Sequence, residues 1–129
     1  MGMDASKTFR VQIYTRAFEK LCAFYGGVLQ LPVLEQRETS YDDRVIVYGA
    51  ASGQIEVIYA PDGMEYPSSN GWTLQIEGED ADASCERVKE LGYEVLRGPQ
   101  DQFWGHRNFK VQDPSGLELT FFSPLKTQR

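Results

Sequence analysis

The sequence predicts an α+β fold in which two tandem βαβββ modules form curved mixed sheets around a cleft, with the helices on the outer faces. The first reason is an internal repeat: at a displacement of 63 residues, Cys22 falls on Cys85 and the segment 52–61 falls on 115–124. A single displacement serves every match, which indicates a duplicated structural unit. The other two reasons are that both halves show the same order of strand-like and helix-like patterns, and that a turn-rich segment joins them.

The first module is expected to begin with a strand at 8–14, in which Phe9, Val11 and Ile13 alternate with polar residues and face the helix. Apolar residues at helical spacing then predict a helix over 17–29, whose last turn is weakened by a pair of glycines. Three further strands are expected at 31–37, 44–49 and 54–60.

The second module repeats this order. A strand is expected at 72–77, with Trp72 toward the helix, and a helix at about 82–91, where Leu91 completes the apolar stripe and Gly92 stops the helix. Three more strands follow. The expected boundaries are an N-terminal tail at 1–7, module one at 8–61, a linker at 62–70, module two at 71–124 and a C-terminal tail at 125–129.

Composition narrows the function classes. The chain of 129 residues has the length of one domain, and its net charge of −6 without any run of Lys or Arg argues against a nucleic-acid partner. No apolar stretch approaches the ~20 residues of a membrane span and no signal peptide opens the chain, so no membrane partner and a cytoplasmic location are expected. The two cysteines do not suggest a disulfide framework.

Two segments carry a resemblance to a known family. The segment AFEKLCAFYGGVLQLPVL at 17–34 resembles the first helix and following strand of the vicinal oxygen chelate superfamily, which includes glyoxalases, extradiol dioxygenases and bleomycin-resistance proteins. The segment at 92–122, which contains WGHRNFKVQDPSG, is similar to the closing segment of that family. The resemblance covers nearly the whole chain and implies a homodimer.

In metal-using members of the family, the first and last strands of each module supply His, Gln or Glu ligands to one divalent ion. The resemblance places these positions at Arg10, at Gly71 or Thr73, at Thr120 and at Val57. A guanidinium stays protonated and cannot serve as a ligand, and the other three side chains are equally unsuitable. The chain also has a single histidine. We therefore expect no metal cofactor and no catalytic residues, although a carboxylate-only magnesium or manganese site remains an alternative.

Strand alternation shows which side chains share a face. For Glu56 the arguments disagree: the repeat turns Val57 into the cleft, whereas the apolar pattern turns Glu56 into it. The candidate ligand-binding residues are Arg10, Gln12, Tyr14, Glu56, Thr73, Gln75, Trp104, His106, Glu118 and Thr120.

Two of these candidates carry opposite charges. Arg10 is expected to take the place of the metal and to pair with Glu118, because an unpaired buried charge is costly. The alternative is that the two merely neutralise each other in a shallow, unused groove.

The aromatic loop has two interpretations. Phe103, Trp104 and His106 line the cleft mouth and stack on a planar ligand, or Trp104 and Phe109 pack in the core while His106 faces solvent. Arg107, which matches Arg44 in the repeat, is expected to have a structural role such as a salt bridge.

The leading hypothesis is therefore metal-independent binding of a small organic ligand, a drug or a metabolite, as in the bleomycin-resistance branch with its role in antibiotic resistance. The alternatives are a lyase, isomerase or dioxygenase of the same superfamily with an atypical metal site, and a module without a ligand.

Overall fold

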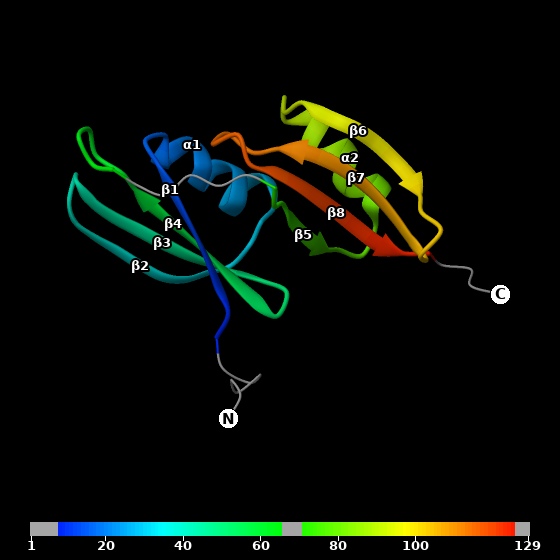
Figure 1. The fold of residues 1–129 in the computed structure, drawn as a ribbon, viewed down its shortest axis with the longest axis horizontal. Helices are drawn as coiled ribbons and strands as arrows, with labels where there is room; N and C mark the ends of the chain where they lie inside the picture. The colour runs from blue at the N-terminus through cyan, green and yellow to red at the C-terminus, as the bar shows by residue number, and fades with distance from the viewer. Residues whose placement is uncertain (1–7, 66–70, 126–129) are drawn as a thin grey trace. The chain divides into compact units, whose positions relative to one another are not determined.

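The structure is a computed structural model that describes residues 8–65 and 71–125. The chain divides into two compact units, Met1–Ser68 and Ser69–Arg129, which we call module 1 and module 2. Each module contains one four-stranded sheet and its own helical segment (Figure 1). In the described part of the chain, no helix has the length and apolar character needed to cross a membrane.

Module 1 has the predicted βαβββ order. Its sheet has the strand order β1-β4-β3-β2, in which β1 and β4 are parallel and the other pairs are antiparallel. Its elements are β1 (Arg10–Thr15), α1 (Phe18–Cys22), the π-helix η1 (Ala23–Val28), β2 (Val33–Ser40), β3 (Asp43–Ala50) and β4 (Gly53–Tyr59).

Module 2 has the same topology, with strand order β5-β8-β7-β6 and one parallel pair, β5 with β8. The prediction of two βαβββ modules with mixed sheets is confirmed. The elements are β5 (Leu74–Glu77), α2 (Ala81–Glu90), β6 (Val95–Asp101), β7 (His106–Gln112) and β8 (Glu118–Pro124).

Each core lies between a sheet and its helix, because one set of alternating strand residues is apolar. Ile13 and Val57 are buried on the helix side in module 1, and Phe109 and Leu119 are buried in module 2. Three expected core residues are instead exposed, which corrects the sequence prediction. Phe9 and Trp72 precede their strands, and Leu91 is the C-cap residue at which the chain leaves α2.

The first helix differs from the continuous α-helix that was expected, because its second half is a π-helix. The amide of Leu29 donates to the carbonyl of Phe24, five residues earlier. This wider turn contains Gly26, where an added Cβ would lie 3.0 Å from the Tyr48 ring. Tyr48 Oη in turn donates to the carbonyl of Cys22 at 3.3 Å, so the absence of a side chain at Gly26 lets the tyrosine pack directly against the helix backbone.

The arginines matched by the repeat have matching structural roles, as predicted. Arg44 forms an ion pair with Glu19 on α1, and Arg107 forms one with Asp82 on α2 at 3.0 Å. Glu19 and Asp82 are also 63 residues apart. Arg107 contacts Asp101 at 2.9 Å as well, and hydrogen bonds to the two carboxylates raise its pKa.

The last strand of each module departs from the 63-residue repeat. Gln12 pairs with Glu56 across β1 and β4, whereas Gln75 pairs with Thr120 across β5 and β8. Gln75 follows Gln12 by 63 residues, but Thr120 follows Glu56 by 64. Glu56, rather than Val57, is therefore the structural equivalent of Thr120.

A longer hairpin loop causes this offset. The β7–β8 connection has one residue more between paired strand residues, from Gln112 to Glu118, than the β3–β4 connection from Gly49 to Gln54. The Asp113 carboxylate organises this loop by accepting hydrogen bonds from the amides two and four residues ahead, at 2.8 and 3.0 Å. Because hairpin loop length sets the register, the added residue slides β8 along by one position.

Candidate functional site

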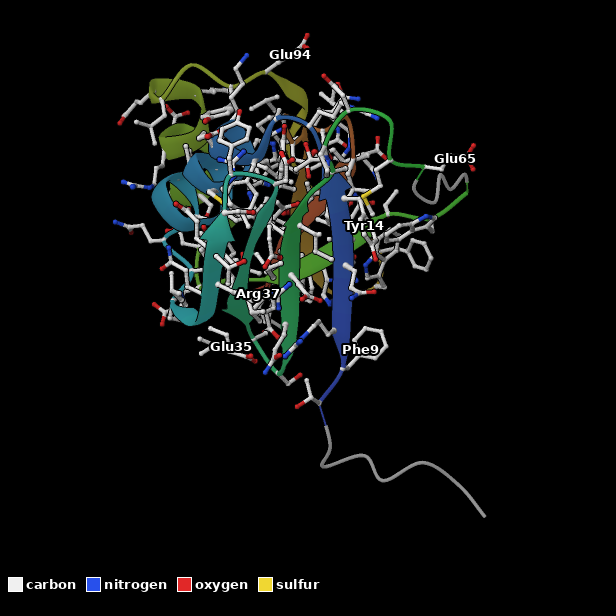
Figure 2. All side chains as sticks on the ribbon, turned by 90° about the vertical axis from the view of Figure 1, so that its left-hand side faces the viewer. Phe9, Tyr14, Glu35, Arg37, Glu65 and Glu94 are labelled. Atoms are coloured by element: carbon white, nitrogen blue, oxygen red, sulfur yellow. The ribbon has the colours of Figure 1, made fainter. Side chains whose placement is uncertain are left out.

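Each sheet has a polar face on the side opposite its helix. Figure 2 shows Glu35 and Arg37 along β2 and Tyr14 on β1. We call the first set the polar face of module 1; it contains Arg10, Gln12, Tyr14, Glu35, Arg37, Gln54 and Glu56. The polar face of module 2 contains Gln75, His106, Asn108, Lys110, Glu118, Thr120 and Phe122.

Arg10 organises the polar face of module 1. Its Nε and Nη2 donate to the Gln54 side-chain oxygen at 3.0 and 2.8 Å, and Nη2 also donates to Glu35 at 2.9 Å. Its Nη1 lies 3.9 Å from a Glu56 oxygen. The Arg10 guanidinium is thus held by polar groups from two neighbouring elements of its own sheet.

The orientation of Glu56, which sequence arguments left open, is settled by the pairing of the strands. Its side chain is 13% exposed and accepts a hydrogen bond from Gln12 at 2.8 Å, while Val57 is buried on the helix side. The apolar alternation gave the correct orientation, and the placement of Val57 on the polar face was wrong.

Lys110 has the corresponding central position in module 2. Its ammonium donates to Thr120 Oγ1 at 3.2 Å and lies 3.7 Å from Glu118. Gln75 is paired with Thr120 from the other side, and Thr120 is buried. Beside them, Asn108 Oδ1 accepts a hydrogen bond from Gln102 at 3.1 Å.

An aromatic cluster lies at one end of the polar face of module 2. The His106 ring stacks on Phe122, with centroids 4.0 Å apart and an angle of 17° between the planes. His106 Nδ1 accepts a hydrogen bond from Trp104 Nε1 at 3.2 Å, which requires the neutral tautomer with its proton on Nε2. Trp104 is 51% exposed, so its expected core packing is wrong, whereas Phe109 is buried as that interpretation expected. Phe103 is almost fully exposed.

The remaining candidates are distributed as follows. Tyr14 is half-buried on β1, and Thr73 is exposed and precedes β5. Arg10 and Glu118 each have an oppositely charged neighbour within their own module, and the pairing of one with the other stays a prediction.

The sequence reasoning missed several residues that complete these networks: Glu35, Gln54, Asn108 and Lys110. A signal for the last two was present, because Asn108 and Lys110 alternate with the buried Phe109 and Val111. That alternation places them on the same face as Thr120 once β7 and β8 are paired.

The donors at the implied metal-ligand positions do not fit a metal ion. Of these positions, corrected for the register, only Glu56 carries a carboxylate, and it already interacts with Gln12 and Arg10. A second fixed cation, Lys110, donates to Thr120. Within residues 8–65 and 71–125, no group of three or more His, Cys, Asp or Glu side chains could hold a metal. A positive charge next to each position would repel a divalent cation.

Solved structures with the same fold cover nearly the whole chain. TnmS3, described as an antibiotic binding protein from Streptomyces sp. CB03234, has a TM-score of 0.71 and 23% identity, covering 95% of this chain and 99% of its own. TioX from Micromonospora sp. ML1 has a TM-score of 0.69 and 17% identity, covering 92% and 99%. Lactoylglutathione lyase from Agrobacterium tumefaciens has a TM-score of 0.68 and 14% identity, covering 94% and 96%. At these identities the similarity shows the fold alone.

Sequence comparison defines the family. No curated protein sequence matches the chain. A family model does match, over residues 7–121, and this range includes both βαβββ modules. The chain therefore belongs to the Glyoxalase/Bleomycin resistance protein/Dioxygenase superfamily.

Proposed function

We propose that this protein binds a small organic ligand, a drug or a metabolite, on its polar sheet faces without the help of a metal ion. The observation that carries the proposal is the pair of cations at corresponding places in the two modules, Arg10 near Glu56 and Lys110 near Thr120. These groups supply charge and hydrogen-bond donors where metal-using relatives would place an ion. Binding through such groups needs no open coordination site.

The chemistry of the faces favours a ligand with both polar atoms and a flat apolar part. Lys110 and Gln75 offer donors, Glu118 offers an acceptor, and the stacked rings of His106 and Phe122 present an aromatic surface. Aromatic side chains stack well on planar groups. The description of TnmS3 as an antibiotic binding protein supports a drug-like ligand and a role in antibiotic resistance by sequestration.

Two further expectations belong to this proposal. We propose a homodimer, which is the state implied by the family resemblance, and a cytoplasmic location. Light scattering coupled to gel filtration tests the first: a dimer has twice the chain mass of 14.6 kDa, and a single peak at the chain mass at all concentrations overturns it.

Metal analysis and a thermal-shift screen test the binding proposal together. Protein purified without chelators should contain no stoichiometric divalent ion. A ligand that binds only the folded state, present at about 100 times its Kd, should add about 2.7 kcal/mol of stability. A tightly held divalent ion, or a broad library with antibiotics in which no compound raises Tm, contradicts the proposal.

A matched pair of variants assigns any ligand found to the polar face. Lys110→Gln removes the ammonium near Thr120, whereas Lys20→Gln removes the same charge from an exposed position on α1. We expect weaker binding only for Lys110→Gln. Equal affinity of both variants would locate the ligand elsewhere.

One observation favours the alternative of a metal-dependent enzyme of the same superfamily. Glu56, which the structure places at the equivalent of Thr120, is a carboxylate with a mostly buried side chain. The metal analysis distinguishes the two functions: a stoichiometric ion that is lost in Glu56→Gln favours the enzyme.

A further inference from the structure

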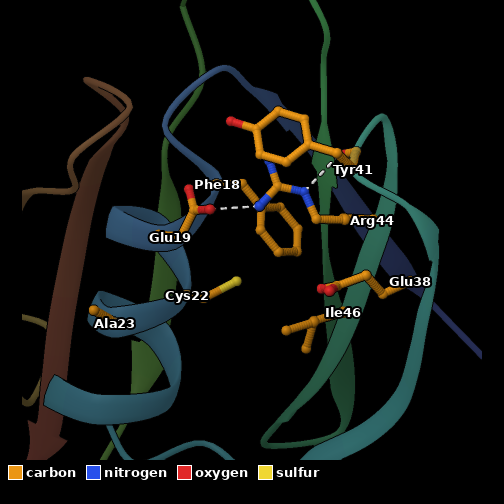
Figure 3. Close-up of a pocket in the computed structure, with 8 residues that line it drawn as sticks. All are labelled: Phe18, Glu19, Cys22, Ala23, Glu38, Tyr41, Arg44 and Ile46. Carbon is orange, nitrogen blue, oxygen red and sulfur yellow. Dashed lines mark hydrogen bonds and ion pairs between the residues drawn. The ribbon is translucent and has the colours of Figure 1, made fainter.

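A second candidate site lies on the helix side of module 1, away from its polar face. It is an open groove with a volume of about 710 Å³ between α1 and strands β2 and β3 (Figure 3). Arg44 and Ile46 reach it from β3, and they alternate with the polar-face side of that strand. The lining residues are Phe18, Glu19, Cys22, Ala23, Glu38, Tyr41, Arg44 and Ile46.

The positive charge in this groove is already compensated. Arg44 is 5% exposed, pairs with Glu19 and donates through Nε to the carbonyl of Tyr41 at 2.7 Å. Its guanidinium carbon lies 4.1 to 4.8 Å from the ring centroids of Phe18, Tyr41 and Tyr59. These rings stabilise the buried cation, whose Nη2 makes no hydrogen bond with any residue in the described part of the chain.

Glu38 is the group that lacks such compensation. It is the cross-strand neighbour of Arg44, yet Arg44 pairs with Glu19 instead. Figure 3 shows the Glu38 carboxylate pointing from β2 toward α1, above Ile46. Among residues 8–65 and 71–125 it has neither an ion pair nor a hydrogen bond. Together, Glu19, Glu38 and Arg44 leave the groove with one net negative charge.

We infer that this groove binds an organic ammonium ion with an apolar body, independently of the ligand proposed for the polar faces. The ammonium pairs with Glu38, and the apolar body lies on Phe18, Ala23 and Ile46. Charge complementarity selects this class, because an organic anion would face two carboxylates and a neutral molecule would leave Glu38 without a partner. The groove volume is within the range of small-molecule sites.

The test uses 2-phenylethylammonium as the probe and the full chain labelled with nitrogen-15. Backbone amide shifts during a titration report where the probe binds. We expect saturable shifts at Cys22, Ala23 and Ile46 and none at Gln12 or Glu56 on the polar face. The neutral analogue 2-phenylethanol should bind about tenfold more weakly, because it cannot pair with a carboxylate.

Variants separate the role of charge from that of shape. Glu38→Gln should weaken binding of the ammonium about tenfold, whereas Glu90→Gln, an equal charge change on the exposed surface of α2, should not. Ala23→Leu should block the groove while leaving the charges unchanged. Circular dichroism confirms that each variant is folded.

Three outcomes would overturn the inference. They are the absence of saturable shifts in the groove, equal affinity of the alcohol and the ammonium, and equal affinity of Glu38→Gln and the unaltered protein. Shifts confined to the polar faces would also overturn it, and they would leave the proposed function standing.

Discussion

Adjacent glycines in η1 offer a sharp test of how closely module 1 is packed. A Cβ added at Gly26 would lie 3.0 Å from Tyr48 Cε1 and 3.1 Å from its hydroxyl oxygen, whereas a Cβ added at Gly27 would have no neighbour within 4 Å. The substitutions Gly26→Ala and Gly27→Ala are chemically identical. They differ only in what the new methyl group meets.

The expected magnitudes follow from these distances. Either alanine should gain about 0.5–1 kcal/mol from the reduced backbone freedom of the unfolded chain. At Gly26 the methyl group would be at least ~0.5 Å inside the usual carbon contact distance, so the Tyr48 ring must shift and weaken its hydrogen bond to Cys22. Overpacking of this kind costs about 1–3 kcal/mol. We therefore expect Gly27→Ala to be more stable than Gly26→Ala by about 1–3 kcal/mol.

Urea unfolding at equilibrium measures this difference, with circular dichroism as the signal. The slope with denaturant should stay constant, since neither change alters the surface exposed on unfolding. Replacing Tyr48 by Leu in both backgrounds should remove most of the difference. Equal stabilities of the two single alanine variants would refute the reasoning, as would a difference that persists without Tyr48.

Three further predictions concern the core and the buried charges. Phe109→Ala should cost about 3–5 kcal/mol in urea unfolding because the ring is fully buried, while Phe103→Ala, at a 97% exposed position, should stay within about 0.5 kcal/mol; similar losses would contradict the assigned core. Hydrogen bonding to Arg44 lowers the pKa of Glu19, so this contribution is present above the unfolded pKa of about 4.5 and should disappear as the pH falls below it. Glu19→Gln should flatten that part of the stability profile, and an unchanged profile would refute the assignment. Arg44→Lys should destabilise the protein by about 2 kcal/mol because an ammonium cannot reproduce the planar stacking, whereas Arg37→Lys, at an exposed ion pair, should change stability by less than about 1 kcal/mol; equal effects on Tm would argue against the ring stacking.

The repeat predicted the fold because it acts at the level of whole modules. It also predicted the salt bridges of Arg44 and Arg107, since the charged partners on the helices follow the same displacement. Periodicity could not reveal the π-helix. A turn with five-residue hydrogen bonds buries Phe24 beside Tyr25, whereas an α-helical stripe omits Phe24.

The candidate site was predicted less completely, for reasons of register and partner choice. Side-chain parity correctly placed Gln12 and Thr120 on the polar faces. It could not show that Lys110 would be the hydrogen-bond partner of Thr120, because that depends on which residues of β7 and β8 lie opposite each other. That register depends on a hairpin loop whose extra residue is hidden by the matching Ser-Gly pairs of the two halves.

The extra residue in the β7–β8 loop also sets a rule for protein engineering. A designer who copies Glu56 into the second module by counting 63 residues would alter Leu119. That side chain is fully buried on the helix side, so a carboxylate there would be stranded in the core. The structurally equivalent change is Thr120→Glu, which would place the new carboxylate next to Lys110. After this duplication, corresponding chemistry in the final strands must be sought one position beyond corresponding sequence.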